Sequence, residues 1–257
     1  MHLFYAGDFE NVLDKIVEHY NEYGVVQLRG LYDNSLCDEI IDDLCNFELE
    51  LEASNTTAVV TETILNQVHL KYCQGIYGKS KAVNKAFSYK LLAIASALLG
   101  EQDIYFSDLE AHLRNPGGGP IPKHQDNFYF NLRIPCALTC YIALSHQDMN
   151  TGALQYIVGS HAKVIDHSFS DNPGFSSFIQ DSCGDLAQIR NLTIFSPTYE
   201  AGDVTIHHPN NIHFANPVPL GSNRGYSLSA RVFPLNSSID DKALLRYKSL
   251  LSANRSE

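Results

Sequence analysis

The chain has 257 residues, of which 44% are hydrophobic and 18% charged, and its formal net charge is −11. This composition is typical of a globular protein with a sizeable core, in one or two domains. No cluster of lysine and arginine interrupts the acidic balance, which argues against nucleic acid or an anionic membrane surface as a partner. No apolar run approaches the roughly 20 residues of a membrane-spanning helix, and no signal peptide is apparent at the N-terminus.

The cysteine pattern indicates the redox compartment. The six cysteines form no CxxC pair, and their density is below that of a secreted disulfide scaffold. We therefore expect reduced thiols in a cytoplasmic protein.

The first 50 residues predict two helices with a strand between them. Apolar side chains at helical spacing predict a helix over residues 9–22, and a short strand follows from Gly24. A second helix is expected after Asp33, where Ser35 stands three residues before Asp38, close to a capping box.

Residues 48–75 are ambiguous, because they contain many β-branched residues without clean alternation. Residues 82–99 predict another helix, and Gly100 stands where a glycine cap would end it. The region 1–100 is therefore expected to be mainly helical.

The remainder predicts a β-rich body over residues 101–236. Apolar residues indicate strands in the segments 103–113, 137–144, 153–158, 204–208 and 225–234. Between them, the polar stretch 162–199 is long for a loop and predicts a lid or insertion. An amphipathic helix over 240–251 closes the chain. The pattern predicts a single α+β domain spanning 1–257.

The tripeptide His124-Gln125-Asp126 is the strongest chemical signal. If it is extended, the imidazole and the carboxylate point to the same face of a strand. One further histidine would complete the two-histidine, one-carboxylate triad of non-haem Fe(II) oxygenases. By itself the residue pattern leaves His207, His208 and His213 as alternatives; in an extended strand His207 and His208 would face opposite sides.

Several motifs coincide in order and spacing. They are His124-Gln-Asp-Asn-Phe-Tyr-Phe, Thr139-Cys-Tyr-Ile-Ala-Leu, Asn150-Thr-Gly-Ala-Leu through Gly159-Ser-His161, Gly202-Asp through His213, and Arg224 eleven residues later. Together they resemble the phytanoyl-CoA dioxygenase family of Fe(II)/2-oxoglutarate-dependent oxygenases. The resemblance covers about residues 24–231.

The resemblance implies a double-stranded β-helix core (a jelly roll, cupin-like) with N-terminal and flanking helices. It implies an enzyme that uses Fe(II), 2-oxoglutarate and O2. By motif position, the metal-binding and catalytic residues are His124, Asp126 and His213, which leaves His207 and His208 as residues that could orient a ligand.

The same resemblance suggests the cosubstrate residues. Arg224 is expected to bind the C5 carboxylate of 2-oxoglutarate, with Arg231 as the rival, since a guanidinium binds carboxylates bidentately. Tyr141 matches a position that lines the cosubstrate pocket, and Thr139 shares its strand face. One departure concerns this subsite: Ala215 replaces the small hydroxyl residue that often stands two residues after the distal histidine. The other, Val158 in place of a proline, affects a turn.

For the substrate, the sequence suggests only a class. The resemblance implies hydroxylation, or another oxidation, of an unactivated C–H bond with release of succinate and CO2. Because the chain is acidic, we expect a small metabolite from natural-product or amino-acid metabolism rather than an acyl-CoA. Asn127, Tyr129 and His112 are candidates to contact it. A metal-ligating Asp126 also predicts oxidation rather than chlorination, since related halogenases lack this carboxylate.

Two alternatives remain open at this level. One is a jelly-roll protein that binds a metal or small acid without turnover, and the other is a protein hydroxylase with an open groove. The oligomeric state is not readable from the sequence.

Overall fold

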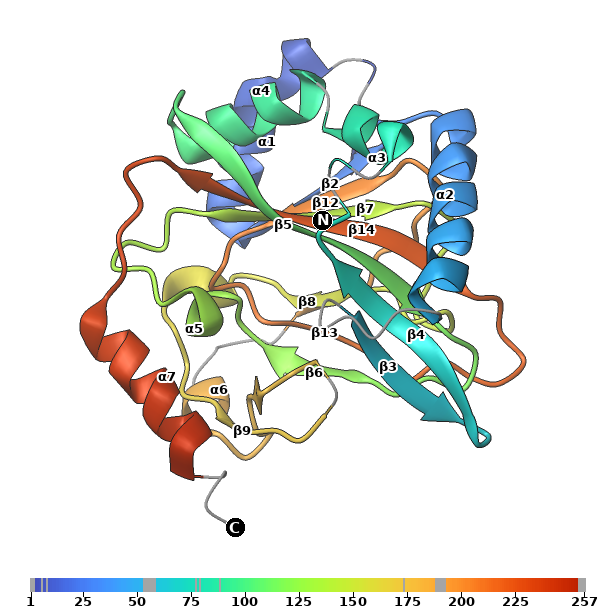
Figure 1. Cartoon of the computed structure of the whole chain (residues 1–257). Coiled ribbons are helices and arrows are strands. Elements are labelled where there is room, and N and C mark those ends of the chain that lie inside the picture. Colours follow the sequence, from blue (N-terminus) through green and yellow to red (C-terminus); the bar gives the residue numbers. More distant parts are fainter. Residues whose placement is uncertain are drawn as a thin grey trace.

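Two β-sheets face each other across a cavity, and the helices of the N-terminal region cover the outer face of the larger sheet (Figure 1). The computed structural model describes residues 3–253, except residues 6, 8, 53–58, 77, 79, 88, 173 and 188–192. The sheets and the N-terminal helices form the α+β architecture that the sequence predicts. No helix in these described ranges combines the length and the apolarity needed to cross a bilayer.

The larger sheet has the strand order β1-β2-β12-β7-β14-β5-β4-β3. Its pairs are antiparallel except for β1 with β2. Its strands are β1 (Leu3–Tyr5), β2 (Val25–Arg29), β3 (Val59–Ile64), β4 (Gln67–Gln74), β5 (Ile104–Arg114), β7 (Leu138–Ala143), β12 (Val204–His207) and β14 (Gly225–Pro234).

The smaller sheet has the order β11-β8-β13-β6, and a separate hairpin pairs β9 with β10. Its register places His213 of β13 opposite His124 of β6, so the two predicted ligands lie side by side. The strands are β6 (Ile121–His124), β8 (Gln155–Ile157), β11 (Ile194–Phe195) and β13 (His213–Ala215), with β9 (Ser168–Phe169) and β10 (Ser177–Phe178) in the hairpin.

The helices of the N-terminal region pack on the large sheet, whereas α5 and α7 lie beside the small one (Figure 1). A 3-10 turn, η2, covers Ser160–Ala162. The helices are α1 (Phe9–Tyr23), α2 (Asn34–Glu52), α3 (Lys81–Ala86), α4 (Tyr89–Leu99), α5 (Asn127–Phe130), α6 (Gly184–Ala187) and α7 (Asp241–Ala253).

Two apolar clusters hold these layers together. The first joins the covering helices to the large sheet and includes Ile16, Leu91 and Ile94, all fully buried. Each such side chain contributes about 1.5–3 kcal/mol by its removal from water. The second cluster lies between the sheets and is rich in tyrosine; Tyr156 and Tyr199 are fully buried there. Its hydroxyl groups need partners, and both bond to the hydroxyl of Thr205.

Two helix ends differ from the sequence expectation. The side chain of Asp33, rather than Ser35, caps α2, because its Oδ1 accepts the amide of Leu36 (2.8 Å). The single helix expected over 82–99 is divided into α3 and α4, and Ser80 caps α3 through the amide of Val83 (2.9 Å). Each short helix can therefore bury its own apolar face.

The ambiguous stretch forms the hairpin β3–β4, which extends the large sheet. Its turn residues, Leu65 and Asn66, both have positive φ (50° and 66°), as a tight two-residue hairpin turn requires. The region 1–100 is thus less helical than expected, because it also supplies β1 to β4. Through β4 it adds residues to one wall of the cavity.

Candidate metal centre

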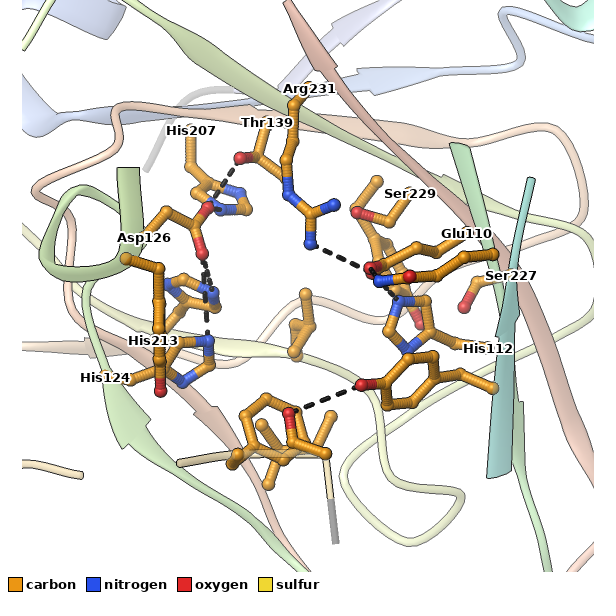
Figure 2. A pocket seen from close by; sticks show the side chains of 18 of the residues that line it. Glu110, His112, His124, Asp126, Thr139, His207, His213, Ser227, Ser229 and Arg231 are labelled. Atoms are coloured by element: carbon orange, nitrogen blue, oxygen red, sulfur yellow. Dashed lines mark hydrogen bonds and ion pairs between the residues drawn. The ribbon is translucent and has the colours of Figure 1, made fainter. Parts of the chain in front are cut away.

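Three predicted ligands converge inside the cavity (Figure 2). His124 ends β6, Asp126 directly precedes α5, and His213 begins β13. One donor atom from each lies within 4.8 Å of the others, and all three residues are buried. Two imidazoles and one carboxylate in this arrangement can bind a divalent ion from one side and leave its opposite side open.

Backbone carbonyls fix the two imidazoles. The Nδ1 of His124 lies 2.8 Å from the Pro122 carbonyl, and that of His213 lies 3.0 Å from the Asn211 carbonyl. These contacts assign the proton to Nδ1 and leave both Nε2 lone pairs free. The Nε2 atoms lie 3.8 and 3.6 Å from Oδ1 of Asp126, too far for a hydrogen bond but suited to a shared ion.

The carboxylate of Asp126 is held through its other oxygen. Oδ2 accepts the hydroxyl of Thr139 at 2.5 Å and lies 3.2 Å from Nε2 of His207. Burial would raise the pKa of Asp126, but the adjacent histidines, His213 first, keep it well below its usual range. Burial also lowers the pKa values of His124 and His213. The donor set at neutral pH is therefore a carboxylate and two neutral imidazoles, which fits Fe(II).

The backbone at Asp126 differs from the extended strand considered above. Its φ and ψ are −61° and −36°, so the chain leaves β6 and enters the turn of α5 at this residue. The carboxylate faces His124 because the chain bends here, and not because side chains alternate along a strand.

A cavity of about 380 Å³ opens next to the triad. Figure 2 shows the triad on one wall and Glu110, His112, Ser227 and Ser229 on the opposite wall. The remaining lining is partly aromatic and includes Tyr72, Tyr129, Phe130, Phe175 and Tyr247.

The polar wall contains a buried ion pair. Glu110 accepts Nη2 of Arg231 at 3.0 Å and Nε2 of His112 at the same distance, and the amide of Gln74 bonds its other oxygen. Burial would raise the pKa of Glu110, but the His112 hydrogen bond and the Arg231 charge lower it to about 2. The wall therefore presents a carboxylate and a guanidinium side by side.

Most of the other predicted residues also line the cavity. Tyr141 lies in its buried part and donates its hydroxyl to Gln147 (2.5 Å). Tyr129 and His112, which the sequence suggested as substrate contacts, also line it. Thr139 lines it too, but its hydroxyl is committed to Asp126. Asn127 is not among the described lining residues; its Oδ1 accepts the amide of Leu132.

The structure contradicts the placement expected for Arg224. Its guanidinium forms a two-point ion pair with Glu48 of α2 (2.7 and 2.8 Å), and its Nε donates to Asn115. Arg224 directly precedes β14, and Tyr226, two residues on, also turns toward α2, where its hydroxyl lies 4.0 Å from the Sγ of Cys45. The cavity-facing arginines are instead Arg231, which was the rival, and Arg114, which the motif did not indicate.

The hairpin β9–β10, within the predicted lid, lies across the cavity. Phe175 in its turn packs edge-on against the ring of His124 at 5.1 Å. Gly174 accepts a hydrogen bond from Tyr72 (3.4 Å) of β4, and Tyr129 donates to the carbonyl of Ser177 (2.9 Å). The residues 173 and 188–192 of the predicted lid lie outside the described residues.

Comparison with known sequences gives two matches. The profile of a family described as "Phytanoyl-CoA dioxygenase (PhyH)" matches residues 20–219. A curated protein of Stutzerimonas stutzeri, named "Probable alpha-ketoglutarate-dependent hypophosphite dioxygenase", is 29% identical over 133 residues. That alignment covers 51% of this chain and 45% of the relative, so the chain matches less than half the length of that protein.

Solved structures share the fold over most of the chain. The epimerase SnoN, determined with Fe3+, alpha ketoglutarate and nogalamycin RO, has a TM-score of 0.70 at 20% identity, covering 93% of this chain and 90% of its own. EctD from S. alaskensis, with 2-oxoglutarate and 5-hydroxyectoine, has a TM-score of 0.72 at 15% identity, covering 88% and 77%. The carbocyclase SnoK has a TM-score of 0.70 at 19% identity, covering 92% and 91%. These likenesses confirm the expected jelly-roll core.

Proposed function

The chain belongs to the phytanoyl-CoA dioxygenase family, and from this premise we propose that it oxidises a C–H bond of a small, polar, neutral or zwitterionic metabolite. The family and the alpha-ketoglutarate-dependent relative support the class expected from the sequence, an iron- and 2-oxoglutarate-dependent dioxygenase. The convergence of two Nε2 atoms and one carboxylate oxygen inside a cavity is the observation that carries the proposal.

His124, Asp126 and His213 would hold Fe(II), which supplies the oxidising power together with 2-oxoglutarate and O2 and releases succinate and CO2. Pro122 and Asn211 keep both Nε2 atoms unprotonated, while Thr139 and His207 aim Asp126. This support keeps the donors in place before any ligand arrives. Because Asp126 occupies the third ligand position, no room for chloride is expected there, and the reaction is an oxidation rather than a chlorination.

The size of the cavity favours a small substrate. Its volume of about 380 Å³ lies near the lower end of the range for small-molecule sites, about 300–1,000 Å³. Because 2-oxoglutarate must share it, little space remains, and an acyl-CoA is a poor fit. The Stutzerimonas stutzeri relative is likewise named for a small substrate.

The charges of the polar wall favour a substrate without net charge. The carboxylate of Glu110 and the guanidinium of Arg231 neutralise each other. Together they offer an acceptor and a donor, which suits an amino acid zwitterion or a hydroxyl-bearing compound. The aromatic residues around them would bury the hydrocarbon part of such a molecule and bring a C–H bond toward the metal.

The hairpin β9–β10 would act as the lid over this site. Its contacts with Tyr72, Tyr129 and the ring of His124 cover the cavity. A lid of this kind excludes water from the reacting groups. The same cover argues against a protein hydroxylase, which needs an open groove.

The cysteine content favours a cytoplasmic location. The six cysteines are spread along the chain, and Cys37, Cys73 and Cys140 are buried in the core. Small secreted domains use their cysteines in disulfides, whereas cytosolic proteins keep them reduced. We expect no nucleic-acid or membrane partner.

Anaerobic addition of Fe(II) and 2-oxoglutarate to the full chain tests the enzyme class. We expect a visible metal-to-ligand charge-transfer band in the wild type and in Asp166→Ala, an exposed aspartate paired with Arg246, and its loss in Asp126→Ala. Absence of the band from folded wild-type protein would refute the proposal and favour a non-catalytic binding protein.

Succinate release with panels of free amino acids, polyols and acyl-CoA thioesters tests the substrate class. Stimulation above the substrate-free rate is expected only from the first two panels. Stimulation confined to acyl-CoA thioesters would contradict the size and charge argument, while leaving the enzyme class intact. Detection of a chlorinated product would contradict the role of Asp126.

A further inference from the structure

Three arginines could bind the far carboxylate of 2-oxoglutarate, and their partners distinguish them. Arg224 is neutralised by Glu48 outside the cavity. Arg231 is neutralised by Glu110 on the cavity wall. Arg114 also lines the cavity, but it has no carboxylate within 4.0 Å among the described residues.

The guanidinium of Arg114 is buried and only partly satisfied. The residue is 3% exposed, and its Nη2 donates to the carbonyls of Gly119 (3.0 Å) and Asn216 (2.8 Å). Its Nε has no hydrogen-bond partner in the described part of the chain. A buried cation that bonds only neutral carbonyls lacks a counter-charge, and an anionic ligand would supply it.

A backbone carbonyl that holds Arg114 lies close in sequence to a metal ligand. Its partner Asn216 directly follows β13 and lies three residues beyond the ligand His213. Arg114 and the triad line the same cavity, so a diacid that chelates the ion through its C1 end could present its C5 carboxylate to this guanidinium. Asn216 also follows Ala215, where the family often has a hydroxyl residue for this carboxylate.

The sheet register explains how an arginine of β5 reaches this place. Arg114 pairs with Gly225, the first residue of β14. A Cβ added at Gly225 would lie 3.3 Å from the Cβ of Arg114, and one at Gly152 would lie 2.5 Å from its Nε. Both glycines therefore leave the space that the arginine side chain fills.

We propose that Arg114, on β5, binds the C5 carboxylate of 2-oxoglutarate in place of the arginine that the family motif puts at the start of β14. Tyr141, which also lines the cavity and interacts electrostatically with Arg114, would lie near this carboxylate. The inference rests on the proposed function, because it assumes that 2-oxoglutarate is the cosubstrate.

The test compares two keto acids that differ at the far end. Anaerobic titration of the Fe(II)-loaded full chain measures affinities for 2-oxoglutarate and for 2-oxopentanoate, which keeps the chelating end and lacks the C5 carboxylate. We expect Arg114→Gln to weaken 2-oxoglutarate binding on the order of 30-fold or more, the cost of removing one partner of a buried charge pair. Its affinity for 2-oxopentanoate should stay within a few-fold of the wild type.

Three further variants keep the result interpretable. Arg114→Lys, which retains the charge without the two-point fork, should give an intermediate preference and serves if Arg114→Gln does not fold. Arg224→Gln and Arg231→Gln should keep the wild-type preference for 2-oxoglutarate. The thermal unfolding midpoint of each variant checks that it is folded.

The outcomes separate this inference from the proposed function. If the wild type gives no charge-transfer band with 2-oxoglutarate, the proposed function fails. If the band forms but folded Arg114→Gln and Arg114→Lys keep the wild-type preference, only the inference fails. Loss of the preference in Arg231→Gln or Arg224→Gln instead would also overturn it.

Discussion

Replacing Thr139 with valine removes the hydroxyl that holds Asp126 while nearly conserving the volume of the side chain. The hydroxyl lies 2.5 Å from Oδ2 of Asp126 in a buried environment. A hydrogen bond to a charged group contributes about 1.5–3 kcal/mol net, and partners of metal ligands typically change affinity about 10–100-fold. Because His207 still contacts Oδ2 at 3.2 Å, we expect a loss near the lower end, about 10-fold.

Calorimetric titration with Mn(II), which resists oxidation, measures this loss. The matched control is Thr205→Val, which also removes a buried threonine hydroxyl but one bonded to Tyr156 and Tyr199. The control should lower the free energy of unfolding without changing the affinity for Mn(II). Equal affinities in Thr139→Val and the wild type, or equal losses in both variants, would refute the idea that Thr139 aims the carboxylate.

Three other changes give distinct outcomes. Glu48→Gln should lower the free energy of unfolding by about 1–2 kcal/mol in urea titrations, because it leaves a half-buried arginine without its charge partner, and should not alter 2-oxoglutarate affinity. Glu110, with its pKa lowered to about 2 in the folded state against an ordinary 4.5, stabilises the fold by about 3 kcal/mol above pH 4.5 and loses this as the pH falls toward 2. The free energies of unfolding of Glu110→Gln and the wild type should therefore converge as the pH falls toward 2. A constant difference between the two from pH 4.5 to pH 2 would contradict the lowered pKa of Glu110. Gly152→Ala and Gly159→Ala both place alanine at positive φ, which should lower the free energy of unfolding by about 1–2 kcal/mol each. Only the new Cβ at residue 152 would contact Arg114. Only Gly152→Ala should therefore weaken 2-oxoglutarate binding in the charge-transfer titration.

The sequence predicts the fold class and the convergence of His124, Asp126 and His213 because both depend on local pattern and order. Helix α1 follows its apolar spacing, and the strand segments appear within one or two residues of their expected bounds. The hairpin β3–β4 was not predicted, because side chains on both of its faces are exposed. Its sequence therefore lacks the alternation of apolar and polar residues that indicates a strand. Its turn, Leu65-Asn66, gave no clear signal either, because leucine rarely adopts the positive φ that it has here.

The arginines that line the cavity could not be found by counting from His213. The motif spacing from His213 leads to Arg224. Whether a residue reaches the cavity depends on the face of the strand on which its side chain lies, and a shift of one residue along the strand moves the side chain to the opposite face. A signal was nevertheless present in β5, where Glu110, His112 and Arg114 alternate with buried apolar residues. Polar residues at every second position of an otherwise apolar strand indicate a face that lines a polar cavity.

The carbonyls that hold His124 and His213 have a consequence for metal loading. Because the Pro122 and Asn211 carbonyls fix both imidazoles, these side chains lose little conformational entropy when an ion binds. Such a site selects poorly between divalent ions. Nitrogen and oxygen ligands bind Co, Ni and Cu more tightly than Fe, in the usual order of affinity for divalent metals. The identity of the ion in the purified protein will therefore follow the supply of metals in the expressing cell, and inhibition by trace nickel or cobalt is to be expected in any assay that does not exclude them.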